Sequence, residues 1–107
     1  MPDNREEDLS QIEEVGKMWY VILIWDIVPP PDTMQKTQRD AIRKEQLRHV
    51  SESIIEATGF DWKRSFKIMK KAKTYGCTIV RHNIYEVCER TKAVLTAKGL
   101  KCHMFPA

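Results

Sequence analysis

The sequence predicts one α+β domain with elements in the order β, α, α, β, α, β, in which helices pack on a small three-stranded sheet. Three observations support this fold class. Residues 18–25 form an unbroken apolar and aromatic run, apolar residues recur at helical spacing in three later stretches, and residues 100–104 alternate between apolar and polar. A chain of 107 residues is long enough for one such domain and too short for two.

Charge is distributed unevenly along the chain. The net charge is +3, but residues 1–14 hold six acidic residues and one basic residue, so this segment carries −5 and the rest carries +8. The composition predicts a disordered acidic leader over residues 1–17 and a folded domain over residues 18–107. A self-shielding arm and a segment engaged by another protein are the alternatives. The leader has no apolar stretch flanked by basic residues, which predicts a cytoplasmic protein or one in an organelle interior such as a plastid.

The run over residues 18–25 is expected to be the central strand. It is rich in β-branched and aromatic residues and is too short for a membrane span of roughly 20 residues, so we expect no membrane partner. It lacks the alternation of a strand with one face in water, and we therefore expect both of its faces to be buried. Asp26 and the prolines at 29–31 end the strand, because proline cannot donate a hydrogen bond to a sheet.

A polar insertion at about residues 28–46 follows the strand. Either Asp32 caps a helix that starts at Thr33 and runs on into the next element, or the insertion is a mobile loop. The next element is a helix whose apolar face recurs every three or four residues and which ends at Gly59. That face consists of Leu47, Val50, Ile54 and Ala57.

The second helix is expected to begin after Asp61, a residue type that caps helix N-termini, and to end at Gly76. Residues 78–80 then form a short strand. The apolar face of this helix consists of Trp62, Phe66, Met69 and Ala72.

The third helix is expected to begin at a capping box formed by Asn83 and Glu86 and to end at Gly99. Residues 100–104 then form a strand with one face in water, because Leu100, Cys102 and Met104 alternate with polar residues. The apolar face of the helix consists of Ile84, Val87, Cys88, Thr91, Val94 and Leu95.

Several of these stretches resemble the ClpS family, the adaptors of the ATP-dependent Clp protease. The matching stretches are residues 20–24 followed by Asp26, residues 49–52, Met69 and residues 76–100, where the register needs no gap. Within and after the last stretch the matching residues are Gly76, Ile79, Val80, Glu86, Glu89, Gly99, Leu100, Pro106 and Ala107. The resemblance covers most of residues 19–107 and implies the fold that this family shares with the C-terminal domain of ribosomal protein L12.

The resemblance implies a non-enzymatic adaptor that docks on the N-terminal domain of a Clp AAA+ chaperone. Such an adaptor modulates or delivers substrates that carry an N-degron, a destabilising N-terminal residue, for proteolysis. The implied chaperone-docking residues lie in the third helix and are Glu86, Glu89 and Lys92. The acidic leader is implied to be engaged by the chaperone pore.

The resemblance also implies a groove for the substrate protein N-terminus, and here the sequence departs from the family. The family's Asn-Asp-Asp run corresponds to Trp25, Asp26 and Ile27, and its histidine corresponds to Lys73. Trp25 cannot accept a hydrogen bond from an α-ammonium group, and Lys73 would place a second cation beside it. We therefore expect an altered N-degron pocket that favours negative charge near the start of the substrate. The expected peptide-binding residues are Trp25, Asp26, Leu47, Val50, Met69, Ala72 and Lys73.

The alternative is a module like the ribosomal stalk domain, or one that binds an anionic partner such as nucleic acid, through the basic second helix. Clustered cations bind anionic surfaces with salt-sensitive affinity, although a solvated face explains the same charges. Trp62, Phe66 and Tyr75 are expected in the core, which disfavours a base-stacking platform and hence nucleic acid. The cations of this helix are Lys63, Arg64, Lys67, Lys70, Lys71 and Lys73.

No catalytic arrangement of side chains is readable in the sequence, so we expect neither enzymatic activity nor a cofactor. The cysteines lack the spacing of a metal site and are expected to be reduced thiols, and with two of the histidines they are too scattered to bind a metal. His49, at a helix start, is expected to be a hydrogen-bonded structural residue or part of a pocket wall. The cysteines and histidines considered for a metal are Cys77, His82, Cys88, Cys102 and His103.

Overall fold

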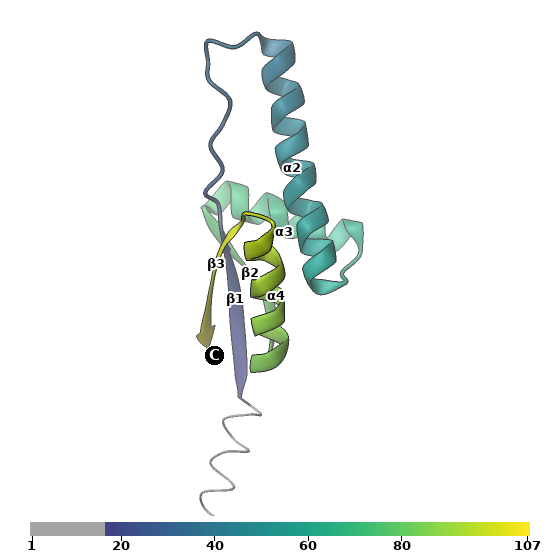
Figure 1. Ribbon diagram of the computed structural model, residues 1–107, viewed down its shortest axis with the longest axis vertical. Helices are drawn as coiled ribbons and strands as arrows, with labels where there is room; N and C mark the ends of the chain where they lie inside the picture. The colour runs from purple at the N-terminus through teal and green to yellow at the C-terminus, as the bar shows by residue number, and fades with distance from the viewer. Residues whose placement is uncertain (1–16) are drawn as a thin grey trace, which may run out of the picture.

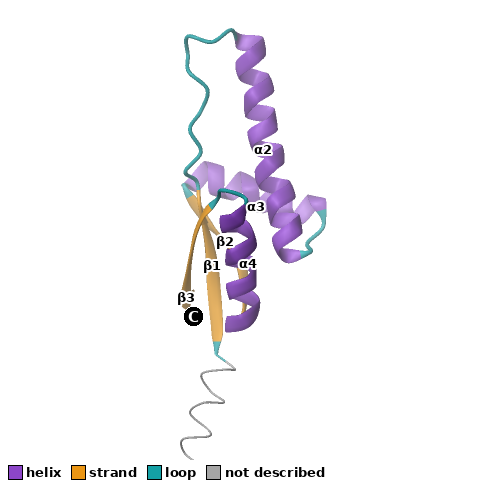
Figure 2. Cartoon of the chain, in the orientation of Figure 1, coloured by secondary structure: helices purple, strands orange, loops and turns teal. Residues whose placement is uncertain are grey.

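The computed structural model describes residues 17–107, and the predicted leader lies outside the described residues except for Lys17. The elements are β1 (Met18–Ile24), α2 (Lys36–Thr58), α3 (Trp62–Tyr75), β2 (Cys77–Ile84), α4 (Tyr85–Ala97) and β3 (Lys101–Pro106) (Figure 2). This order confirms the predicted fold class. Among the described residues, no helix has both the length and the apolar character needed to cross a membrane.

The sheet has the order β2-β1-β3, and β1 is antiparallel to both of its neighbours. Val21 lies opposite Arg81 and Ile22 lies opposite Ile79, so Val80 is an extra residue that forms a β-bulge in β2. β2 and β3 are the edge strands of this sheet.

The hydrophobic core lies on one face of the sheet, between the strands and all three helices. Val21 and Leu23 of β1 are at most 1% exposed and pack in one cluster with buried residues of α2, α3 and α4. The alternate residues of β1 lie on the opposite face, where Ile22 is half-buried and Ile79 of β2 is 49% exposed. The prediction that both faces of β1 are buried is therefore wrong, because no described element covers this second face.

Residues 36–46 of the polar insertion form the first half of α2, a continuous helix of 23 residues, and residues 28–35 belong to the segment that connects β1 to it. Figure 1 shows this half extending beyond the sheet, with the connecting segment from β1 beside it. Of the two interpretations of the insertion, the helix that runs on into the next element is confirmed from Lys36 onward, but the predicted start at Thr33 is wrong. Asp32 does not cap it, because Pro31 accepts a hydrogen bond from Met34 in a turn and the N-cap position falls on Gln35.

The predicted N-cap of α3 is confirmed, whereas the predicted capping box of α4 does not form. The side chain of Asp61 accepts a hydrogen bond from the backbone N–H of Arg64 at 2.8 Å, as an N-cap does. The capping box at Asn83 is wrong, because β2 continues through Ile84, which is itself the N-cap of α4 without a side-chain hydrogen bond. Asn83 Oδ1 instead accepts a hydrogen bond from the backbone N–H of Ile84.

The aromatic residues of α3 lie outside the core. Trp62 is 50% exposed, Phe66 is 36% exposed and Tyr75 is 77% exposed, so the prediction that they are core residues is wrong. The buried face of α3 is formed by Ser65, Met69 and Ala72. Two of these are small, which lets the helix pack closely and turns the aromatic residues toward solvent.

Candidate functional site

The segment after β1 lines a small cavity where the resemblance implies the peptide pocket. Trp25, Asp26 and Val50 line it together with the turn that precedes β3, and its volume is about 10 Å³. This is no more than one water molecule needs. The structure therefore brings three of the predicted peptide-binding residues together but leaves no room for a side chain between them.

Trp25 is held in place from both its backbone and its ring. Its backbone N–H donates to the Gly76 carbonyl at 2.8 Å, which joins the end of β1 to the end of α3. Its side chain is half-buried and packs against the core. Lys73, three residues before Gly76, is exposed.

The predicted peptide-binding residues of α2 and α3, apart from Lys73, are buried or half-buried. Met69 and Ala72 have 0% exposure, and Val50 has 1%. Leu47 is half-buried and packs against the core. Met69 and Ala72 thus belong to the core and do not line the cavity, and Asp26 is the exposed polar residue that lines it.

A larger groove lies directly beside the small cavity, and we refer to it as the α2 groove. Its volume is about 450 Å³. The polar insertion supplies one wall, and the segment after β1 and the turn before β3 supply the others. The α2 groove is lined by Ile27, Ile42, Glu45, Gln46, His49, Lys98, Gly99 and Leu100.

Hydrogen bonds and one ion pair position the walls of the α2 groove. Gln46 Nε2 donates to the Val28 carbonyl at 2.8 Å, which ties the segment after β1 to α2. His49 Nε2 lies 2.9 Å from the Lys98 carbonyl, so this ring nitrogen carries the proton. Lys98 Nζ also pairs with Glu56 at 2.8 Å. His49 is thus both a hydrogen-bonded structural residue and part of a pocket wall.

The groove combines apolar walls with one unpaired acid. Ile27, Ile42 and Leu100 supply the apolar surface. Glu45 belongs to none of the ion pairs among residues 17–107, although its charge acts on Arg48, and the cation that also lines the groove, Lys98, is paired with Glu56. Such a site suits a ligand with one cationic group and one apolar group. The sequence did not lead us to predict Glu45 as a binding residue. The feature that could have indicated a groove here is Ile42, an apolar residue within a polar insertion.

The predicted chaperone-docking residues share one face of α4. Glu86, Glu89 and Lys92 are spaced by three residues, and both acids are exposed while Lys92 is half-buried. Tyr85 packs edge-on against Trp19 with ring centres 5.0 Å apart. A hydrogen bond with Glu89 and the negative charge of Glu89 raise the pKa of the Tyr85 phenol.

Comparisons with known proteins inform the fold. No protein-family model matches this sequence, and no curated protein matches it either. Among solved structures, Agrobacterium tumefaciens ClpS2 bound to L-phenylalaninamide superposes with a TM-score of 0.60 at 13% sequence identity. The match covers 86% of this chain and 99% of ClpS2. The chain therefore has a ClpS-like fold.

Proposed function

We propose that this protein is a non-enzymatic adaptor that docks on a Clp AAA+ chaperone and holds the N-terminus of a substrate protein in the α2 groove. The observation that carries the proposal is the position of this groove. In a ClpS-like fold, an apolar groove with an unpaired carboxylate lies beside the closed cavity at the end of β1.

The chemistry of the groove supports recognition of a free N-terminus. L-phenylalaninamide, the ligand of ClpS2, presents an α-amine beside an aromatic side chain. In the α2 groove, Glu45 can accept hydrogen bonds from an α-ammonium group, and Ile42 and Leu100 can cover an apolar first side chain. Trp25 lines the neighbouring cavity, whose volume of about 10 Å³ leaves no room for a first side chain there. In this proposal the N-degron pocket is altered because it lies in the α2 groove and not at the end of β1.

Peptide titration tests this assignment. A fluorescent peptide that begins with phenylalanine should bind the protein, and acetylation of its amine or Glu45→Gln should weaken binding about tenfold, because a charge-assisted hydrogen bond is lost. Asp40→Asn is the matched control, since Asp40 is an exposed acid of α2 outside the groove. Equal binding of the free and acetylated peptides would contradict the proposal. A version with glutamate at the second position tests the preference for negative charge expected from Lys73.

We propose α4 as the chaperone-docking surface and the acidic leader as a segment that the chaperone engages. Glu86 is the exposed acid in the first turn of α4, next to the pair formed by Tyr85 and Glu89. Glu86→Lys should reduce capture by the isolated N-terminal domain of a Clp chaperone while leaving peptide binding in the α2 groove intact. Capture that is unaffected by this charge reversal would exclude α4 as the docking surface.

A second candidate function uses the outer face of α3 to bind an anionic partner such as single-stranded nucleic acid. The exposed rings of Trp62 and Phe66 stack with centres 6.2 Å apart, and Lys70 Nζ lies 5.6 Å from the Phe66 ring. Exposed aromatic and cationic side chains together suit stacked bases. Reversal of Lys67 and Lys70 to glutamate should abolish this function and spare chaperone capture, whereas Glu86→Lys should have the opposite effects.

A further inference from the structure

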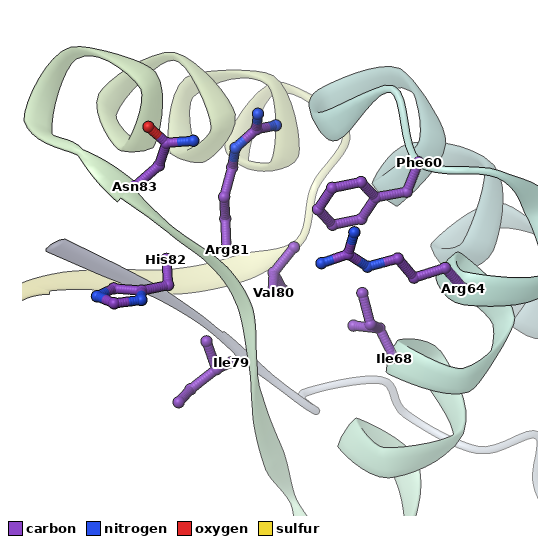
Figure 3. Close-up of a pocket in the computed structure, with 8 residues that line it drawn as sticks. All are labelled: Phe60, Arg64, Ile68, Ile79, Val80, Arg81, His82 and Asn83. Carbon is purple, nitrogen blue, oxygen red and sulfur yellow. The ribbon is translucent and has the colours of Figure 1, made fainter. Parts of the chain in front are cut away.

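A second cleft lies along the outer edge of β2, away from the α2 groove. Its volume is about 410 Å³, and it is lined by residues 79–83 of β2 together with Phe60, Arg64 and Ile68 (Figure 3). Successive side chains of a strand point to opposite faces of the sheet. A cleft lined by five consecutive residues therefore follows the edge of the strand, where the backbone of β2 has no strand partner in the described sheet.

Two guanidinium groups converge on one aromatic ring in this cleft. Arg64 Cζ lies 3.7 Å from the centre of the Phe60 ring, and Arg81 Cζ lies 5.5 Å from it. Neither arginine belongs to an ion pair within residues 17–107. Arg81 Nη1 donates to the Thr58 carbonyl at 3.0 Å, while its Nε is buried without a protein acceptor. Two guanidinium groups that flank one ring and pair with no acid among residues 17–107 form a site for anionic groups.

The β-bulge explains why Arg81 faces this cleft. Val80 is the extra residue of β2 and is buried with 3% exposure on the helix side of the sheet. Arg81 lies opposite the buried Val21, so it also faces the helix side. Ile79 lies opposite Ile22 and is 49% exposed on the face of the sheet that no described element covers, which we refer to as the open face. The edge of β2 thus has cationic side chains on one face of the sheet, Arg81 from the strand and Arg64 from α3, and an exposed apolar side chain on the other face. A segment with acidic side chains on one face and apolar side chains on the other would complement it.

We propose that the edge of β2 binds an extended segment of a partner protein in which acidic and apolar residues alternate. The segment adds a strand to the sheet through backbone hydrogen bonds. Its acidic side chains then face Arg64 and Arg81, and its apolar side chains lie beside Ile79 on the open face. Charge complementarity and the period of two residues along a strand together define this partner. The site shares no lining residue with the α2 groove, so it is a separate binding site.

Binding of a designed probe tests the proposal. The probe is an eight-residue peptide in which glutamate and valine alternate, acetylated at its N-terminus so that it cannot use an α-ammonium site. We expect binding that weakens with added salt, about tenfold weaker binding of R64M and R81M, and chemical-shift changes in the backbone amides of residues 79–83. The matched control is K63M, because Lys63 is an exposed cation of α3 outside the cleft.

Four results would overturn the proposal. Equal binding of a probe with glutamine in place of glutamate would show that charge does not contribute to binding. Chemical-shift changes confined to the α2 groove would show that the peptide binds there and not at the edge of β2. An RNA oligonucleotide that binds more tightly than the probe and loses affinity in R64M would identify a nucleic-acid site. Binding that appears only when residues 1–16 are removed would identify the chain's own acidic leader as the occupant. R64M, which changes an exposed residue, keeps the test valid if R81M fails to fold.

Discussion

At the scale of single residues, Trp25 packs against the core at the end of β1. Its backbone is fixed by the hydrogen bond to the Gly76 carbonyl, and its ring packs against buried residues. The cavity left beside it has a volume of about 10 Å³. A smaller side chain would enlarge this cavity without moving the backbone, because the hydrogen bond does not involve the side chain.

Replacing Trp25 with alanine should therefore open the cavity at the end of β1. We expect Trp25→Ala to lower the free energy of unfolding by about 2 kcal/mol, less than for a fully buried ring, and to add binding of L-phenylalaninamide at this position. Urea denaturation and NMR titration measure the two effects. Trp62→Ala, at a half-exposed position, should change stability by less than about 1 kcal/mol. Equal losses for the two variants would show that Trp25 does not fill the core.

The exposed thiol of Cys77 should react before the buried thiol of Cys88. Burial raises the pKa of the Cys88 thiol, whose Sγ donates to the Trp19 carbonyl at 3.4 Å, whereas Cys77 is exposed. A raised pKa means that the fold favours the neutral thiol, so this contribution to stability is complete below the ordinary thiol pKa and is lost as pH rises through the raised value. Iodoacetamide labelling between about pH 7 and pH 10, read by mass spectrometry, should modify Cys77 first. Early modification of Cys88 would contradict its protection.

At the scale of elements, the sequence predicted helix ends correctly at Gly59, Gly76 and Asp61, where residues close in sequence form the cap. Gly59 and Gly76 follow α2 and α3 with φ of 77° and 85°, a left-handed conformation that favours glycine. These ends and the cap at Asp61 were predictable because each depends on residues within one turn. The start of α2 was not, because Pro31 and Met34 form a turn ahead of the helix and Asp32, instead of capping it, pairs with Arg39 at 3.7 Å, farther along the chain.

The cap at Asp61 gives a prediction for α3. Asp61→Ala should lower the free energy of unfolding by about 1 kcal/mol, because the N–H of Arg64 loses its acceptor. Asp61→Ser should retain most of the stability, since serine also caps helices. Thermal and urea unfolding measure both variants. The control is Asp32→Ala at an exposed position that caps no helix, and a loss there as large as at Asp61 would remove the capping explanation.

At the scale of the whole molecule, the core lies on one face of the sheet, and no element within residues 17–107 covers the other face. Leu95 of α4 has 0% exposure and lies in the core cluster, whereas Ile79 lies on the open face. Leu95→Ala should therefore lower the free energy of unfolding by about 3 kcal/mol, and Ile79→Ala by less than about 1 kcal/mol. Urea denaturation of the two variants compares the faces directly. Similar losses would indicate that the open face is covered in solution.

The sequence by itself determined the order of the elements, the three helices and the central position of the apolar strand, because periodicity and caps act over a few residues. The sequence also predicted the buried faces of α2 and α4, where Val50, Ile54, Cys88 and Leu95 are at most 1% exposed. Tertiary structure decided which faces of β1 and α3 are buried. The alternation of Val21, Ile22 and Leu23 between faces is invisible when all three are apolar, and the small Ser65 and Ala72 place the aromatic residues of α3 outside. It also decided the candidate sites, because Glu45 meets Leu100, and Arg81 meets Phe60, only after distant segments pack together.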